Sequence, residues 1–146
     1  MTVIVSIDGS AEPSPAIRLA AREARYRDCP LVAVTAYSGE TALGAPAARP
    51  VTTLRTVADE QLTAEAMLRD AVDEALGDEA TSVELRVTRG LAGRRFVEAA
   101  REVRADLIVL AARGSMSLLL GAVSQYVLRH APCPVLVVPA GAGAIS

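Results

Sequence analysis

The segment Val3-Ile4-Val5-Ser6-Ile7, followed by Asp8-Gly9-Ser10, points directly to the fold class of this chain. Four of its first five residues are apolar and β-branched, which is typical of a strand that other elements cover on both faces. Strands of that kind occur in parallel sheets whose crossover connections are helices. Asp8 and Gly9 are turn residues and end the strand. The segment therefore predicts a buried parallel strand of an α/β domain.

Further short apolar runs follow this segment along the chain, at Leu31–Ala36, Val83–Val87, Leu107–Leu110 and Val135–Val138. Segments with helical spacing of apolar residues separate these runs. In the second of these four, Val83, Leu85 and Val87 alternate with charged residues, as in a more exposed strand. The alternation predicts an open, five-stranded parallel sheet with helices on both faces.

Four helices are expected between the strands. The first begins at Ser14 as its N-cap, the second carries apolar residues from Leu54 to Leu76, the third follows Gly93, and the fourth runs from about Gly121 to Arg129. Gly77 is expected to end the second helix. The stretch 38–50 is interpreted as a connecting loop, and 141–146 as a tail of small residues.

The length and composition favour one domain over residues 1–146. A chain of 146 residues can bury one substantial core. Hydrophobic residues make up 51% of the chain but aromatic residues only 3%, so the expected core is aliphatic. The cysteines, Cys29 and Cys133, lack the spacing of a zinc site or disulfide framework, and both are interpreted as buried thiols.

Charge and hydropathy argue against two classes of partner. The net charge is -2, and the 15 basic residues form no stripe that would bind a nucleic-acid backbone. There is no run of 18 apolar residues and no recognisable targeting segment, so neither nucleic acid nor a membrane is expected as a partner. We expect a cytoplasmic protein.

Chemistry in such a sheet is expected just beyond the carboxyl ends of its strands, where crossovers leave toward opposite faces. Asp8 follows the first strand, and Ala111 to Ser115 follow the fourth. Gly121 then opens the last helix, whose free amides and positive dipole end favour a phosphate. The lysine of a Walker loop does not follow Gly121, so this is a different kind of phosphate cradle.

Three segments carry a family resemblance that spans the chain. They are Val3-Ile-Val-Ser-Ile-Asp-Gly-Ser10, Ala105-Asp-Leu-Ile-Val-Leu110 and Gly121-Ala-Val-Ser-Gln-Tyr-Val-Leu-Arg-His-Ala-Pro-Cys-Pro-Val-Leu-Val-Val138. Together they resemble the universal stress protein family. The resemblance implies a Rossmann-like, three-layer fold of the adenine nucleotide alpha hydrolase type, with homodimers formed through the last strand, Val135–Val138. It also implies that ATP or another adenine nucleotide is a candidate ligand, because some members bind one.

The phosphate loop departs from the pattern of the nucleotide-binding members, which is Gly-x-x-Gly, nine residues, then Gly-Ser/Thr. Ala111 stands at the first glycine, only six residues separate Gly114 from Gly121, and Ala122 replaces the hydroxyl residue. Ser124 supplies a hydroxyl two positions later. We therefore expect weak binding of triphosphates and better acceptance of a monophosphate.

The resemblance assigns roles by position. Asp8 would contact the ribose or the adenine, and the backbone of Ala36 would lie against the base. The remaining nucleotide-binding residues would surround the phosphates, with Mg²⁺ entering only together with the nucleotide: Leu110, Ala111, Arg113, Gly114, Gly121, Ala122, Val123 and Ser124. No catalytic residue is assigned, and the expected role is that of a regulatory stress-response module.

Other interpretations stay open. Asp8 could serve only to close its turn. The chain could be a dimeric protein-interaction module without a nucleotide, its crevice filled by Leu118 to Leu120. A nucleotide-hydrolysing enzyme would need a base and a metal-binding carboxylate pair, and the sequence offers neither beyond Asp8.

Overall fold

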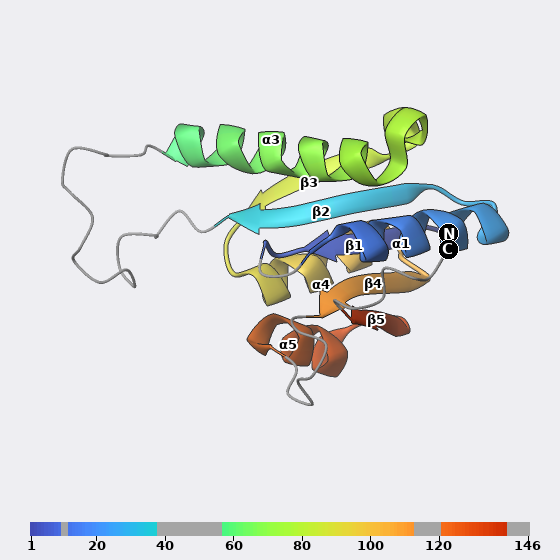
Figure 1. Ribbon diagram of the computed structural model, residues 1–146. Helices are drawn as coiled ribbons and strands as arrows, with labels where there is room; N and C mark the ends of the chain where they lie inside the picture. Colours follow the sequence, from blue (N-terminus) through green and yellow to red (C-terminus); the bar gives the residue numbers. More distant parts are fainter. Residues whose placement is uncertain (10–11, 38–56, 113–120, 140–146) are drawn as a thin grey trace.

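The computed structural model describes residues 1–9, 12–37, 57–112 and 121–139. Five parallel strands form one sheet in the order β3-β2-β1-β4-β5, and Figure 1 shows them in this order from top to bottom. The strands are β1 (Val3–Ile7), β2 (Leu31–Tyr37), β3 (Glu84–Arg89), β4 (Leu107–Ala112) and β5 (Val135–Pro139). The predicted fold class is confirmed, and each strand end lies within two residues of the predicted one.

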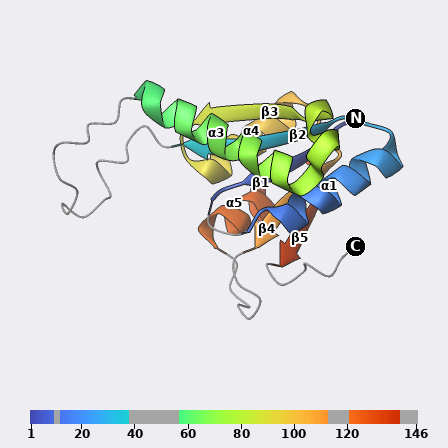
Figure 2. The ribbon, with the colours of Figure 1, turned by 45° about the horizontal axis from the view of Figure 1, so that its top comes forward.

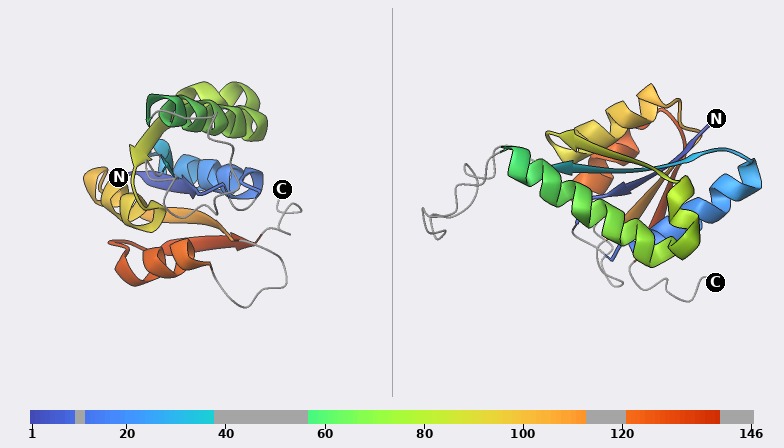
Figure 3. Two further views of the ribbon diagram at one scale, coloured as in Figure 1. Left: turned by 90° about the vertical axis from the view of Figure 1, so that its left-hand side faces the viewer. Right: turned by 90° about the horizontal axis from the view of Figure 1, so that it is seen from above.

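The helices cover the sheet in two layers. On one face, α1 (Ser14–Arg27) packs against β1, whose Val3, Val5 and Ile7 lie in that core, and α3 (Val57–Leu76) packs against β2 and β3. On the other face, α4 (Ala92–Glu102) and α5 (Ala122–His130) pack around Ile4 of the same strand. Figure 3 shows the resulting three layers. The alternation of β1 side chains between two cores explains why nearly every residue of that strand is apolar.

The start of α1 differs from the prediction. Pro13, not Ser14, is the N-cap, and Ser14 and Pro15 are the first two helical residues. The carboxylate of Glu12 accepts a hydrogen bond of 3.1 Å from the Ser14 amide. That amide, the Ser14 hydroxyl and the charge of Arg18 hold the pKa of Glu12 below its usual range. An acidic side chain before the helix thus performs the capping expected of the serine.

The second predicted helix, α3, buries a narrower face than its apolar residues indicated. Only Ala64, Leu68 and Val72 of α3 are buried, at intervals of four residues. Leu62 and Met67, which belong to the apolar pattern from Leu54 to Leu76, are 64% and 45% exposed. The helix lies along one side of the sheet (Figure 2), so a single stripe suffices to cover β2 and β3. Leu54 and the loop 38–50 lie outside the described residues.

Gly77 ends α3 as predicted, with a left-handed φ of 58°. The chain then continues into a short 3₁₀ helix, η1 (Gly77–Ser82), which the sequence did not predict. Gly93 lies inside the first turn of α4 instead of preceding it. Among the described residues, no helix combines the length and apolarity needed to span a membrane.

Candidate functional site

The candidate site lies at the carboxyl ends of β1 and β4, which pair directly in the centre of the sheet. The chain leaves β1 for α1 on one face and leaves β4 for α5 on the other. Neighbouring connections that diverge in this way open a crevice at the strand ends, where open α/β sheets bind their ligands. The topology therefore places Asp8 opposite the amino end of α5.

A buried hydrogen bond fixes the backbone just before Asp8. The hydroxyl of Thr35 on β2 donates to the carbonyl oxygen of Ile7 over 2.7 Å. Both residues are at most 3% exposed. The half-buried carboxylate of Asp8 thus extends from a strand end that the neighbouring strand holds in place.

The amino end of α5 faces the same crevice. Gly121 is the N-cap, and within the described part of the chain no side chain caps the helix. The first turn, Ala122-Val123-Ser124, contains no acidic residue. Its amide hydrogens and the positive end of the helix dipole are thus available for an anion. Ser124 is 7% exposed and brings a hydroxyl to this turn.

These groups line one cavity of about 250 Å³. Its lining consists of residues from β1, β4 and the amino ends of two helices: Asp8, Ala92, Ala111, Gly121, Ala122, Val123 and Ser124. The volume lies just below the range of about 300 to 1,000 Å³ that is usual for pockets of drug-sized ligands. An acidic group that follows one strand and the amino end of a helix meet in this cavity, which suits a ligand carrying both hydroxyl groups and an anion.

Most of the predicted site residues line this cavity, and the structure adds one. Ala36 is half-buried at the end of β2, in the core on the α4 and α5 side, but is not part of the lining. Leu110 is 2% exposed and packs in the same core. Arg113, Gly114 and the leucines 118–120 lie outside the described residues. The addition is Ala92, whose methyl side chain carries no chemical signal that a sequence could reveal.

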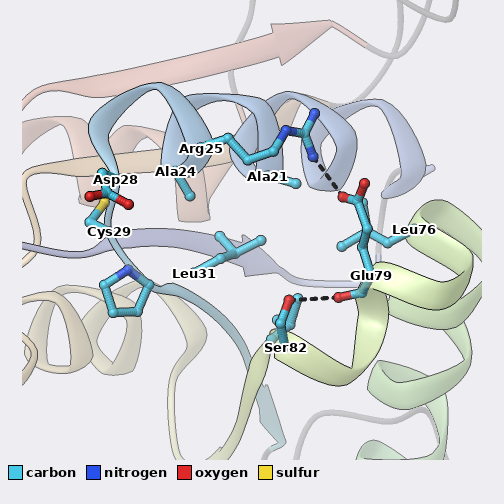
Figure 4. A pocket seen from close by; sticks show the side chains of 11 residues that line it. Ala21, Ala24, Arg25, Asp28, Cys29, Leu31, Leu76, Glu79 and Ser82 are labelled. Atoms are coloured by element: carbon cyan, nitrogen blue, oxygen red, sulfur yellow. Dashed lines mark hydrogen bonds and ion pairs between the residues drawn. The ribbon is translucent and has the colours of Figure 1, made fainter.

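A second cavity, of about 280 Å³, lies at the opposite, amino ends of the strands (Figure 4). Arg25 and Glu79 form an ion pair of 2.6 Å beside it, and Asp28, Cys29 and Ser82 contribute to its lining. Although it is slightly larger, it lies away from the strand ends at which this type of sheet binds ligands. Both charged partners are 59% exposed, so their pairing contributes little to stability.

The remaining candidate groups show little chemistry. Within residues 1–9, 12–37, 57–112 and 121–139, no cluster of three or more His, Cys, Asp or Glu side chains could hold a metal ion. Cys29 and Cys133 are half-buried, whereas both were expected to be buried. Burial and the nearby Asp106 carboxylate raise the pKa of the Cys133 thiol. A raised pKa keeps a thiol protonated and therefore less nucleophilic.

Comparisons with known proteins agree with this architecture. Residues 1–139 match the family model described as "Universal stress protein family". A universal stress protein from Thermus aquaticus is 34% identical over 143 residues, covering 94% of this chain and 97% of that protein. A universal stress protein of Mycobacterium tuberculosis is 33% identical over 147 residues, and the match covers 93% of this chain but only 46% of that protein.

A solved structure gives the same relationship in three dimensions. The crystal structure of a universal stress protein in complex with cAMP superimposes with a TM-score of 0.70 at 30% sequence identity. The superposition covers 97% of this chain and 98% of the other.

Proposed function

The chain belongs to the universal stress protein family, and on that premise we propose that it binds an adenine nucleotide with a single phosphate group in the cavity beside Asp8. The observation that carries this proposal is the meeting of the Asp8 carboxylate with the amino end of α5 in one cavity. A mononucleotide presents the two matching groups, ribose hydroxyls and a phosphate. The cAMP complex of the structural relative supports the same ligand class.

The phosphate is assigned to the first turn of α5. The amides of Ala122 to Ser124 and the Ser124 hydroxyl would donate hydrogen bonds to it. Each hydrogen bond to a charged phosphate oxygen contributes about 1.5 to 3 kcal/mol. Because Ala122 lacks a hydroxyl and the cavity measures about 250 Å³, one phosphate fits this proposal better than three.

The sugar and base are assigned to the strand ends. The Asp8 carboxylate would accept hydrogen bonds from ribose hydroxyls, and the backbone of Ala36 would lie against the base. These residues fit the organic part of a nucleotide, and Mg²⁺ enters the proposal only as a companion of the phosphate. Asp8 is the one titratable side chain among the described residues that line the cavity, and we assign it to the ribose, so the role we propose is regulation by binding, without turnover.

We further propose that residues 1–146 form one cytoplasmic domain that pairs as a homodimer through β5. This strand is at the edge of the sheet, and Val135, Leu136 and Val137 on it are half-buried. An apolar edge strand invites pairing with another strand, and a symmetric partner would satisfy it. Light scattering on the purified protein tests this, and Val137→Lys should yield monomers of unchanged secondary structure.

Calorimetric titration with AMP, cAMP, ATP and adenosine tests the ligand. We expect AMP or cAMP to bind more tightly than ATP, and adenosine to bind weakly because it lacks the phosphate. At 100 times the dissociation constant, a ligand should stabilise the protein by about 2.7 kcal/mol. If none of the four binds at millimolar concentration, the proposal is wrong.

A substitution at the N-cap of α5 gives the sharpest control. Gly121→Asp should place a carboxylate at the helix end, where it caps the amides and repels phosphate. Gly121→Asn offers a neutral cap of the same size. We expect both variants to be at least as stable as the wild type, and AMP binding to be much weaker in the aspartate variant than in the asparagine variant. Equal AMP affinities in the two would place the phosphate elsewhere.

A further inference from the structure

Two helices bring their amino ends to the candidate cavity. Ala92 is the first residue of α4, and Gly121 is the N-cap of α5; both line the cavity. The two helices pack against each other on the same face of the sheet. The distance between their amino ends therefore bears directly on the shape of the cavity.

One close contact brings these helices together near the cavity. Gly93 follows Ala92 and is buried, and a Cβ atom added to it would lie only 3.0 Å from both Cβ and Cδ1 of Tyr126. Tyr126 lies two residues beyond Ser124 on α5. Since the Cβ of Tyr126 is attached directly to the backbone, any larger residue at 93 must move one helix relative to the other.

Further contacts hold Tyr126 and the carboxyl end of α5. The tyrosine ring packs on the ring of His130, with centroids 4.3 Å apart. Arg101 of α4 donates a hydrogen bond of 3.3 Å to the carbonyl oxygen of His130. The two helices are thus joined at the middle and at the carboxyl end of α5. Rotation of the Tyr126 side chain cannot relieve a clash with residue 93, because it leaves the Cβ atom of Tyr126 in place.

We infer that Gly93 and Tyr126 are positioning residues, which set the separation of the α4 and α5 amino ends and thereby the fit of the ligand's phosphate. This inference rests on the proposed function and extends it to residues that do not line the cavity. Gly93→Ala should displace the first turn of α5 by a few tenths of an ångström. Hydrogen bonds to a phosphate are sensitive to such displacements, whereas contacts at Asp8 and Ala36 should change little.

The first experiment compares AMP with adenosine. Gly93→Ala is expected to weaken AMP binding about tenfold and adenosine binding less than about twofold. Tyr126→Phe keeps the ring and should bind AMP like the wild type. Gly77→Ala is the matched control: Gly77 has open space around it, lies outside the cavity lining and has a φ of 58°, so alanine there should destabilise the fold without changing the AMP to adenosine ratio. Equal losses for both ligands in Gly93→Ala would overturn the inference.

A second measurement needs no ligand. Amide chemical shifts of Ala122, Val123 and Ser124 in the free protein should change in Gly93→Ala and stay unchanged in Gly77→Ala. If they do not change in Gly93→Ala, the inference is wrong, whatever the binding data show. If they change but the wild type binds none of the nucleotides, the proposed function fails while the positioning of α5 by Gly93 stands.

Discussion

The hydroxyl of Thr35 and the carbonyl oxygen of Ile7 form a buried hydrogen bond of 2.7 Å between the carboxyl ends of β2 and β1. The parallel register pairs these two residues directly. The bond satisfies a backbone acceptor at the point where β1 ends and the chain turns toward the cavity. The Thr35 side chain of β2 thereby holds the end of β1, which Asp8 follows directly.

We expect Thr35→Val to leave the Ile7 carbonyl without this partner, at a cost of about 1 to 3 kcal/mol in unfolding free energy. Urea denaturation measures it. Thr35→Ser is the control, because it retains the hydroxyl and should lose much less. A valine variant as stable as the wild type would mean that the bond contributes nothing to stability.

Loss of the Ser6 hydroxyl should raise the unfolding free energy, whereas loss of the Thr35 hydroxyl should lower it. The Oγ atom of Ser6 is fully buried and, within the described part of the chain, has no hydrogen-bond partner. A buried hydroxyl without a partner costs free energy, so Ser6→Ala should raise the unfolding free energy, by up to about 1 kcal/mol. Denaturation alongside Thr35→Val checks the contrast. A clear loss of stability would show that Ser6 makes a hydrogen bond.

The strands were predictable because a strand that is buried on both faces consists mostly of apolar residues. Val3 to Ile7 contains four apolar residues, and the structure buries all five of its residues. The stripe of α3 was less predictable, since Leu62 and Met67 are apolar yet largely exposed. A helix at the side of a sheet buries a narrower face than its composition suggests.

The candidate site, too, could be predicted from the sequence only in part. Asp8 and Gly121 were recognisable because they lie just after a buried strand and just before a helix, at the strand ends where such a sheet binds ligands. Ala92, Gly93 and Tyr126 were not recognisable as parts of the site, because their importance arises from the packing of α4 on α5. Such a contact joins residues more than 30 positions apart, and no local pattern records it.

Stability at acidic pH should depend on Glu12. Its pKa is lowered in the folded protein, chiefly by the Ser14 amide, so its contribution is fully present above the pKa of the unfolded chain. The contribution is lost as the pH falls through the lower, folded-state value. We therefore expect Glu12→Gln to be less stable than the wild type at pH 7 and equally stable near pH 2. Thermal unfolding across this range measures the difference, and a gap that stays constant with pH would contradict the assignment.

The reactivity of Cys133 should depend on Asp106. Burial is the larger cause of its raised pKa, and the Asp106 carboxylate adds to it. In a Cys29→Ser background, where Cys133 is the one remaining thiol, we expect slow alkylation by iodoacetamide at pH 8. Adding Asp106→Asn removes the charge but keeps an oxygen that can accept the Thr2 amide hydrogen bond of 3.2 Å. The rate should then rise, by less than about tenfold, because burial of the thiol persists.

In denaturant, the two proteins should react at nearly the same rate, since neither burial nor the fixed carboxylate then acts on the thiol. Equal rates in the folded proteins would show that Asp106 does not influence the thiol.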